Sequence, residues 1–330
     1  MVLEPNSVIG WARVASIFLC FAWAAWLDHL ERRVPNQHWI TWSQPAMFLM
    51  LLELIVAQAD ISLFLFASGL FALASMSVIG RPTISDILAG NKTDIAVSLW
   101  YALGIVGLLL GIPKYAFVDM TDLLLGNVTG LELIWWQLLA VGLVIIVIDL
   151  GWRFRLIHGG ADAKALMLVA LTMPHWDAVP VISPIEMEIS LGLPPAISIL
   201  MWGGLAFLLI PIVTSIENLI KGNLNSISDL IRIFHTIKIP VDEVLTRHVW
   251  LLTTVSESAD GEKIVSHKLK APRRTPSDEK LREQVNEIKY LGIEKVWVTR
   301  KFPLLVFLWP AIIPMIIWGD FMGLVTLVLL

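Results

Sequence analysis

Runs of about 20 apolar residues recur along the chain and constrain its fold more than any other feature of the sequence. Each run is long enough to span a bilayer as an α-helix. The chain is 57% hydrophobic and only 16% charged, a composition foreign to a water-soluble domain of 330 residues. A membrane β-barrel would instead show short segments of alternating hydrophobicity. The sequence therefore predicts an all-α polytopic membrane protein.

Eight apolar spans can be counted, so about eight transmembrane helices are predicted. The second and third are so close that one long kinked helix is an alternative, and it would reverse the orientation of everything after it. The sixth is short, and we expect it to extend through the proline-rich stretch at 174–184. The spans are Val8–Leu27, Ser43–Gln58, Ile61–Gly80, Ile95–Ile112, Leu131–Leu150, Asp162–Met173, Ala196–Ile216 and Phe302–Leu329.

Basic residues in the short loops indicate the orientation, because cytoplasmic loops carry an excess of Lys and Arg. The loops after the first, third and fifth spans hold Arg32, Arg33, Arg81, Lys92, Arg153 and Arg155. Those after the second, fourth and sixth spans hold only Lys114. The first set is therefore predicted to be cytoplasmic, and with eight spans both termini would lie outside the cell membrane.

The segment 221–301 differs in character, since it holds 15 of the 24 Lys and Arg residues together with 11 acidic ones. It is predicted to be a small cytoplasmic α+β domain between a transmembrane core at 1–220 and a final transmembrane helix at 302–330. Its expected elements are strands at His248–Val255, Glu262–Lys268 and Lys295–Thr299, a turn at Ala259–Gly261, and a helix ending near Leu291.

Asp28 lies at the end of the first span, ahead of Val34-Pro35-Asn36, which stops the helix and turns the chain. Ionisable residues at membrane depth are costly and usually functional. The helix dipole is negative at this end, so a carboxylate is disfavoured there. The alternative is an interfacial polar residue that merely ends the span.

Asp162 starts the sixth span, within the motif Gly159-Gly160-Ala161-Asp162-Ala163-Lys164. One interpretation is that Asp162 only caps the N-terminus of the helix. Two features go beyond that interpretation: the two glycines allow another backbone to approach closely, and Lys164 places a charge inside an apolar run. The helix dipole acts with opposite sign on Asp28 and Asp162, which is the asymmetry that an acid/base dyad requires.

A pair of carboxylates is the minimum equipment for aspartyl-protease chemistry, with one acting as base and one as acid. Asp149, near Asp162 in sequence, is an alternative partner to Asp28. A metal site is not expected, because Cys20 is the only cysteine and no His-Glu-x-x-His occurs. The basic residues of 221–301 are balanced by acidic ones, so nucleic-acid binding is not expected either.

Together these residues carry a resemblance. Asp28 with Val34-Pro35-Asn36, followed later by Gly159-Gly160-Ala161-Asp162-Ala163-Lys164, resembles the type IV prepilin peptidases, which are membrane aspartyl proteases of the GxGD class. The archaeal prepilin and preflagellin peptidases are the most similar members. The tail at 295–303 also resembles their ending, a strand that leads into the final helix.

The resemblance implies cleavage of prepilin or preflagellin leader peptides at the cytoplasmic membrane face, without a cofactor. Two departures matter: Ala161 stands where a strict GxGD motif has glycine, and eight spans exceed the six usual in short archaeal members. The bacterial cysteine motif is absent, so methylation is not expected. The residues to which the resemblance assigns roles are the catalytic Asp28 and Asp162 and the supporting Pro35, Asn36, Gly159, Gly160, Ala161 and Lys164.

Two other functions stay open. A presenilin-like intramembrane protease would pair Asp149 with Asp162 on adjacent helices. A proton-coupled transporter would use the same buried carboxylates for ion movement, and broken inverted repeats, which the sequence does not show, would favour it. The expected partners are precursor proteins and the lipid bilayer.

Overall fold

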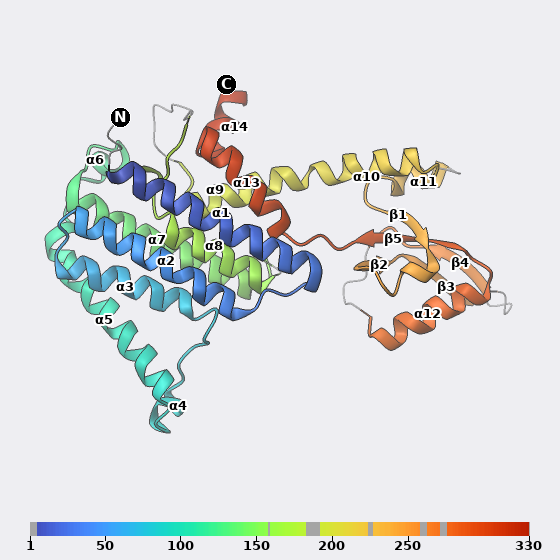
Figure 1. Ribbon diagram of the computed structural model, residues 1–330, viewed down its shortest axis with the longest axis horizontal. Coiled ribbons are helices and arrows are strands. Elements are labelled where there is room, and N and C mark those ends of the chain that lie inside the picture. The colour runs from blue at the N-terminus through green and yellow to red at the C-terminus, as the bar shows by residue number, and fades with distance from the viewer. Residues whose placement is uncertain are drawn as a thin grey trace. The chain divides into compact units, whose positions relative to one another are not determined.

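The computed structural model describes residues 5–157, 159–182, 192–223, 227–257, 263–270 and 276–329. The chain divides into two compact units, residues 1–204 with 303–330, and residues 205–302 (Figure 1). We call them the helical unit and the small unit. The chain is mostly helical, with a small α/β region near its C-terminal end. Both features were predicted.

The helical unit is built from α-helices and one 3-10 turn. Within the described residues, five segments are long and apolar enough to cross a membrane: Val8–Glu31, Asn36–Val56, Lys92–Tyr115, Gly130–Arg153 and Pro195–Ile220. Two shorter apolar helices, α3 and α13, accompany them. The count of eight spans therefore stays a prediction. The elements are α1 (Pro5–Glu31), α2 (Asn36–Val56), α3 (Ile61–Ser75), α4 (Ile84–Leu88), α5 (Lys92–Tyr115), α6 (Met120–Leu124), α7 (Gly130–Arg153), α8 (Gly160–Thr172), η1 (Trp176–Ala178), α9 (Pro195–Phe207), α13 (Leu305–Trp318) and α14 (Phe321–Leu329).

Helix α8 is the centre of this unit. It packs against α1, α2, α3 and α7, and every side chain from Ala165 to Thr172 is buried. A helix that is apolar on all sides belongs in an interior, which explains why its 13 residues show no amphipathic pattern. The position of its first turn is thereby set by the helices that surround α8.

The second and third spans are separate helices. The Asn36 side chain, at the start of α2, donates to the Val78 carbonyl beyond the end of α3, at 2.9 Å, so the two helices run antiparallel. Between them Gln58 is left-handed, with φ 54°, and Asp60 accepts from the Ser62 and Leu63 N–H groups at the start of α3. Burial raises the pKa of Asp60, but hydrogen bonds from Lys114 and Ser62 outweigh it and hold the pKa well below its usual range.

Three predicted spans differ from the observed helices. The sixth does not extend into the proline-rich stretch, because α8 ends at Thr172 and η1 follows after Pro174. The seventh is divided at Leu208 into α9 and α10. The last is interrupted by Gly319, whose φ of 79° is incompatible with a continuous helix. Apolar content alone does not reveal such interruptions.

The small unit combines a three-stranded antiparallel sheet, in the order β1-β5-β2, with a β3-β4 hairpin. Its core joins Val285 and Ile288 of α12 to Val296 and Val298 of the central strand β5. The elements are α10 (Leu209–Ile220), α11 (Ile227–Arg232), β1 (Ile237–Pro240), η2 (Val241–Glu243), β2 (Val249–Leu251), β3 (Thr253–Glu257), β4 (Lys263–His267), α12 (Asp278–Tyr290) and β5 (Lys295–Arg300).

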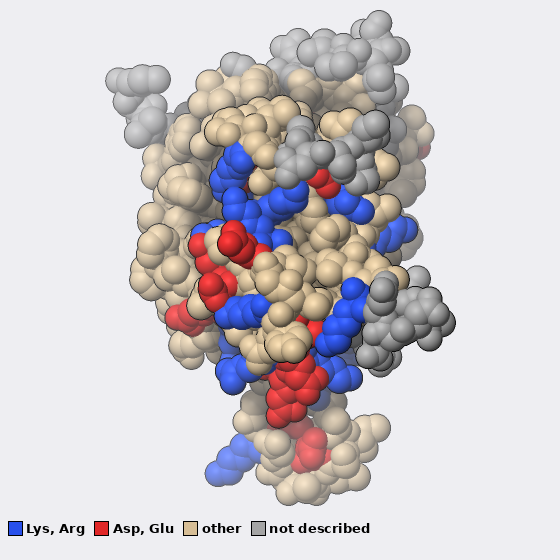
Figure 2. Space-filling view, turned by 90° about the vertical axis from the view of Figure 1, so that its right-hand side faces the viewer, with Lys and Arg blue, Asp and Glu red and all other residues tan. Residues whose placement is uncertain are grey.

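Most of the predicted elements of this unit are present. Ser277 caps α12 and Gly292, with φ 72°, follows its end. The predicted strand His248–Val255 is divided at Leu252 between the sheet and the hairpin, and β1 was not predicted. The turn at Ala259–Gly261 lies outside the described residues. Basic and acidic side chains are interspersed on the face drawn in Figure 2.

Candidate active site

Asp28 is half-buried in the last turn of α1. The helix ends three residues later, where Arg32 adopts a left-handed conformation with φ 56° and its N–H donates to the Asp28 carbonyl at 3.2 Å. Pro35, with φ −66° and ψ 149°, then stands directly before the first residue of α2, Asn36. The Val34-Pro35-Asn36 motif therefore does turn the chain, and the turn fixes Asp28 at the exit of its helix.

Asp162 lies in the first turn of α8, and it is not the N-cap. Gly159 takes that place, with extended backbone, and the Asp162 carboxylate reaches back to accept from the Gly159 N–H. A Cβ on Gly159 would collide with this carboxylate. Gly160 is also close-packed, because a Cβ there would lie 3.3 Å from the Trp152 ring. The glycines are thus required by the position of the carboxylate and by the packing around it.

The two aspartates are brought together. Asp28 is close enough for its charge to act directly on Asp162, although 133 residues lie between them in the chain. Arg13, in the first half of α1, contacts Thr172 at the end of α8, so the two helices run antiparallel. Both carboxylates therefore lie at the same end of the bundle. A third charge acts there as well: Arg32 acts on Asp28, and its Nε is buried without a hydrogen-bond partner among the described residues.

A hydrogen bond joins the two motifs directly. Lys164 Nζ donates to Asn36 Oδ1 at 2.7 Å, and the Asn36 amide donates onward to Val78. The start of α8, the turn after α1 and the end of α3 are therefore tied at one point. Lys164 binds the asparagine of the first motif, and Ala161 lies beside Asp162 within the same helical turn.

Asp149 forms ion pairs with two arginines. It is buried in α7, and its Oδ2 lies 2.8 Å from both Arg81 and Arg153. A carboxylate neutralised by two guanidinium groups has its lone pairs occupied and its charge compensated. The structure thus gives Asp149 ion-pair partners, whereas Asp28 is the carboxylate whose charge acts on Asp162.

A cleft of about 170 Å³ opens beside Lys164, between α2, α3, α5 and α8. Its walls are mostly apolar. The Trp39 side chain lines it, is buried, and has an indole N–H without an acceptor among the described residues. The lining includes Trp39, Met47, Phe71, Trp100, Lys164, Met167 and Leu171.

A buried polar cluster that was not predicted from the sequence joins α1 and α8, the helices that carry Asp28 and Asp162, to α2. Arg13 of α1 is fully buried; it donates to the Thr172 carbonyl of α8 and pairs with Glu53 of α2 at 2.5 Å. Glu53 in turn lies 2.8 Å from His175. Sequence offered one signal, an arginine inside an apolar span, which is itself a mark of function or of helix association. Among the described residues, no group of three or more His, Cys, Asp and Glu side chains could hold a metal ion.

Comparison with known proteins gives one match. Residues 228–321 fit the family model described as Archaeal Peptidase A24 C-terminus Type II. The match covers most of the small unit and the whole of α13, and it does not reach Asp28 or Asp162. No curated protein matches the chain.

Proposed function

We propose that this chain, which the C-terminal match supports as a member of the prepilin and preflagellin peptidase family, is a membrane-embedded aspartyl endopeptidase with Asp28 and Asp162 as its catalytic pair. A domain of the A24 family implies a protease. The observation that supports the aspartyl assignment is the meeting of the two carboxylates at one end of the bundle, with their motifs joined by Lys164 and Asn36.

The chemistry follows from that pair. Two close carboxylates share one proton, because both cannot ionise at short range without strong repulsion. The ionised member takes a proton from water, which attacks the scissile carbonyl, while the protonated member donates to the carbonyl oxygen. As the C–N bond breaks, the leaving amine takes the proton that the first carboxyl group received from water, and a hydroxyl of the tetrahedral intermediate returns a proton to the second. Each group returns to its starting state after one turnover, so no metal or other cofactor is needed.

The proposed substrate is a pilin-like or archaellin precursor, with a short basic leader and an apolar helix. The helix would lie in the bilayer against the enzyme and leave the scissile bond at the cytoplasmic face, where the basic loops predict both motifs to lie. The cleft beside Lys164 supports this arrangement. It offers apolar walls for a side chain of the substrate.

Co-expression with candidate precursors tests the proposal. Wild-type protein should shorten a precursor, seen as increased gel mobility, and Asp162→Asn should leave it at full length while accumulating to the same level in the membrane. Asp119→Asn is a matched control, since Asp119 is exposed and caps a short helix. If no precursor is shortened, or if Asp162→Asn is as active as wild type, the proposed function is wrong.

The alternatives give different outcomes in the same experiment. A presenilin-like pairing requires Asp149→Asn to be inactive and Asp28→Asn to be active. A transporter would show no cleavage by any variant, and proton flux across vesicles would depend on the same carboxylates, Asp28 and Asp162.

A further inference from the structure

Helix α11 of the small unit has its charged face inward and its apolar face outward. Asp229 is only 6% exposed, and its carboxylate lies 3.5 Å from both Arg232 and Lys238. Leu230 and Ile231, on the same short helix, are 51% and 63% exposed, and Phe234 just after it is 56% exposed. A helix on a water-facing surface has the opposite arrangement.

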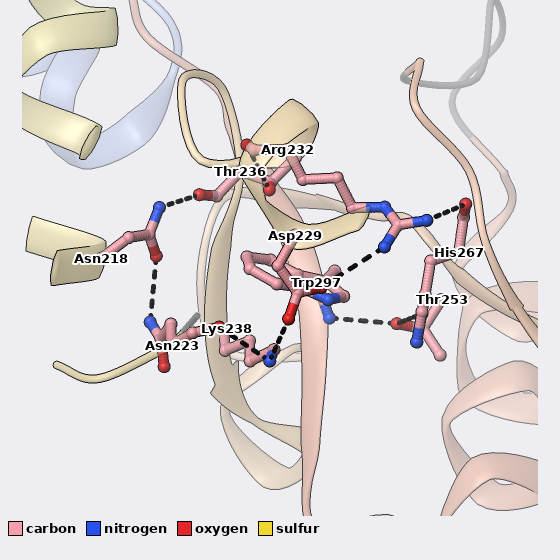
Figure 3. A network of polar contacts seen from close by, with 9 residues as sticks. All are labelled: Asn218, Asn223, Asp229, Arg232, Thr236, Lys238, Thr253, His267 and Trp297. Atoms are coloured by element: carbon pink, nitrogen blue, oxygen red, sulfur yellow. Dashed lines mark hydrogen bonds and ion pairs between the residues drawn. The ribbon is translucent and has the colours of Figure 1, made fainter. Parts of the chain in front are cut away.

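The inward face of α11 is part of a polar network. Figure 3 shows Asp229 between Arg232 and Lys238, with Thr253 and Trp297 close by. Lys238 also lies over the Trp297 ring, with its Nζ 4.5 Å from the centroid. Burial, with the charge of Arg232, lowers the pKa of His267 on the neighbouring strand. Because Asp229 is paired with two cations inside the unit, α11 keeps this face inward and its side chains Leu230 and Ile231 point away.

Hydrogen bonds join the chain just after α11 to the end of a candidate membrane span. Asn218, in the last turn of α10, donates to the carbonyls of Ile233 and Thr236 at 3.0 and 2.6 Å. The span Pro195–Ile220 ends two residues later. Apolar exposure continues across that end, since Ile220 is 81% exposed. The chain that follows α11 is therefore held against the last turn of that candidate span.

We propose that α11 and Phe234 form an interfacial anchor, which inserts Leu230, Ile231 and Phe234 into the boundary between lipid headgroups and acyl chains. In water these side chains would form an exposed apolar patch, the feature that marks a docking surface. At the interface, a short helix with one apolar face lies in the membrane plane. The lipid bilayer, and not a protein partner, is the occupant, because the anchor adjoins the point where the chain leaves the membrane. The inference does not rest on the protease activity.

Spin-label accessibility of the full-length protein in phospholipid vesicles tests the anchor. In a Cys20→Ala background, Ile231→Cys and Phe234→Cys are labelled in separate samples. Tyr290→Cys is the control, because Tyr290 is 85% exposed on α12, away from α11 in the sequence. Collision rates are measured with oxygen, which partitions into lipid, and with a water-soluble nickel chelate.

The anchor predicts that both labels on α11 shift toward oxygen and away from nickel relative to the control. Equal ratios at all three positions would show that α11 faces water. Protection of the Ile231 label from both reagents would show that protein covers it, either another part of the chain or a second copy. Either result would overturn the proposal, and two labelled positions keep the test valid if one substitution disturbs folding.

Discussion

At the residue scale, the sequence motifs identify the residues of the site but not the contacts between them. The motif around Asp162 indicated glycines that allow close approach, and the approach is made by the carboxylate of Asp162 itself, over Gly159. The link from Lys164 to Asn36 was not predicted, because a hydrogen bond between positions 128 residues apart leaves no local pattern. Each motif identifies candidate site residues, and only the fold shows which of these residues contact one another.

Gly159→Ala is expected to lower cleavage without unfolding the protein. The new methyl group forces the Asp162 carboxylate from its place, and misplacement of a reacting group by about 1 Å can cost about 100-fold in rate. Initial rates in detergent-solubilised membranes measure the effect. Gly204→Ala is the control, since a Cβ there meets nothing within 4 Å. Equal loss in both variants would point to general damage.

The effects of Asn36→Ala and Lys164→Met on the cleavage rate should not add. Both remove the hydrogen bond that joins the motifs, so the double variant is expected to be no slower than the worse single variant. For residues in contact, coupling energies of about 0.5–3 kcal/mol are typical. A double-mutant cycle on kcat/KM measures the coupling. Strictly additive losses would mean that the bond has no part in holding the two motifs.

At the scale of elements, apolar runs predicted where helices occur better than where they end. The run from 302 to 329 contains Gly319, and its positive φ divides α13 from α14. Strand β5 and helix α12 followed their local patterns. Arg13 was not predicted to clamp three helices, because its partners, Glu53 and the Thr172 carbonyl, come from distant parts of the chain.

Arg13→Met is expected to destabilise the helical unit by about 1–3 kcal/mol, because the buried Thr172 carbonyl and the partly buried Glu53 lose a hydrogen-bond donor. Glu53 keeps His175 as a partner. Thermal unfolding in detergent measures the loss. Arg13→Met combined with Glu53→Gln should recover part of it, since the carboxylate that lost its donor is gone. A double variant less stable than the single one would show that Glu53 has sufficient partners without Arg13.

At the scale of the whole molecule, composition was enough to predict a mostly helical membrane protein with a small α/β region. Orientation rests on six basic residues against one in the short loops. It predicts that Arg33 and Leu156, in the turns that follow α1 and α7, face the cytoplasm. In a Cys20→Ala background, Arg33→Cys and Leu156→Cys should react alike with an impermeant thiol reagent, in inverted vesicles only. Opposite sidedness would place the two motifs on different membrane faces.

The most direct test of the catalytic pair is single-turnover cleavage of a precursor by purified protein in proteoliposomes. Asp28→Asn and Asp162→Asn should each abolish cleavage at unchanged thermal stability, and the double variant should be no worse, because residues that act as one unit are not additive. Asp149→Asn should keep its activity, apart from a loss of stability through Arg81 and Arg153. Cleavage by Asp28→Asn at the wild-type rate, with none by Asp149→Asn, would contradict the pairing of Asp28 with Asp162.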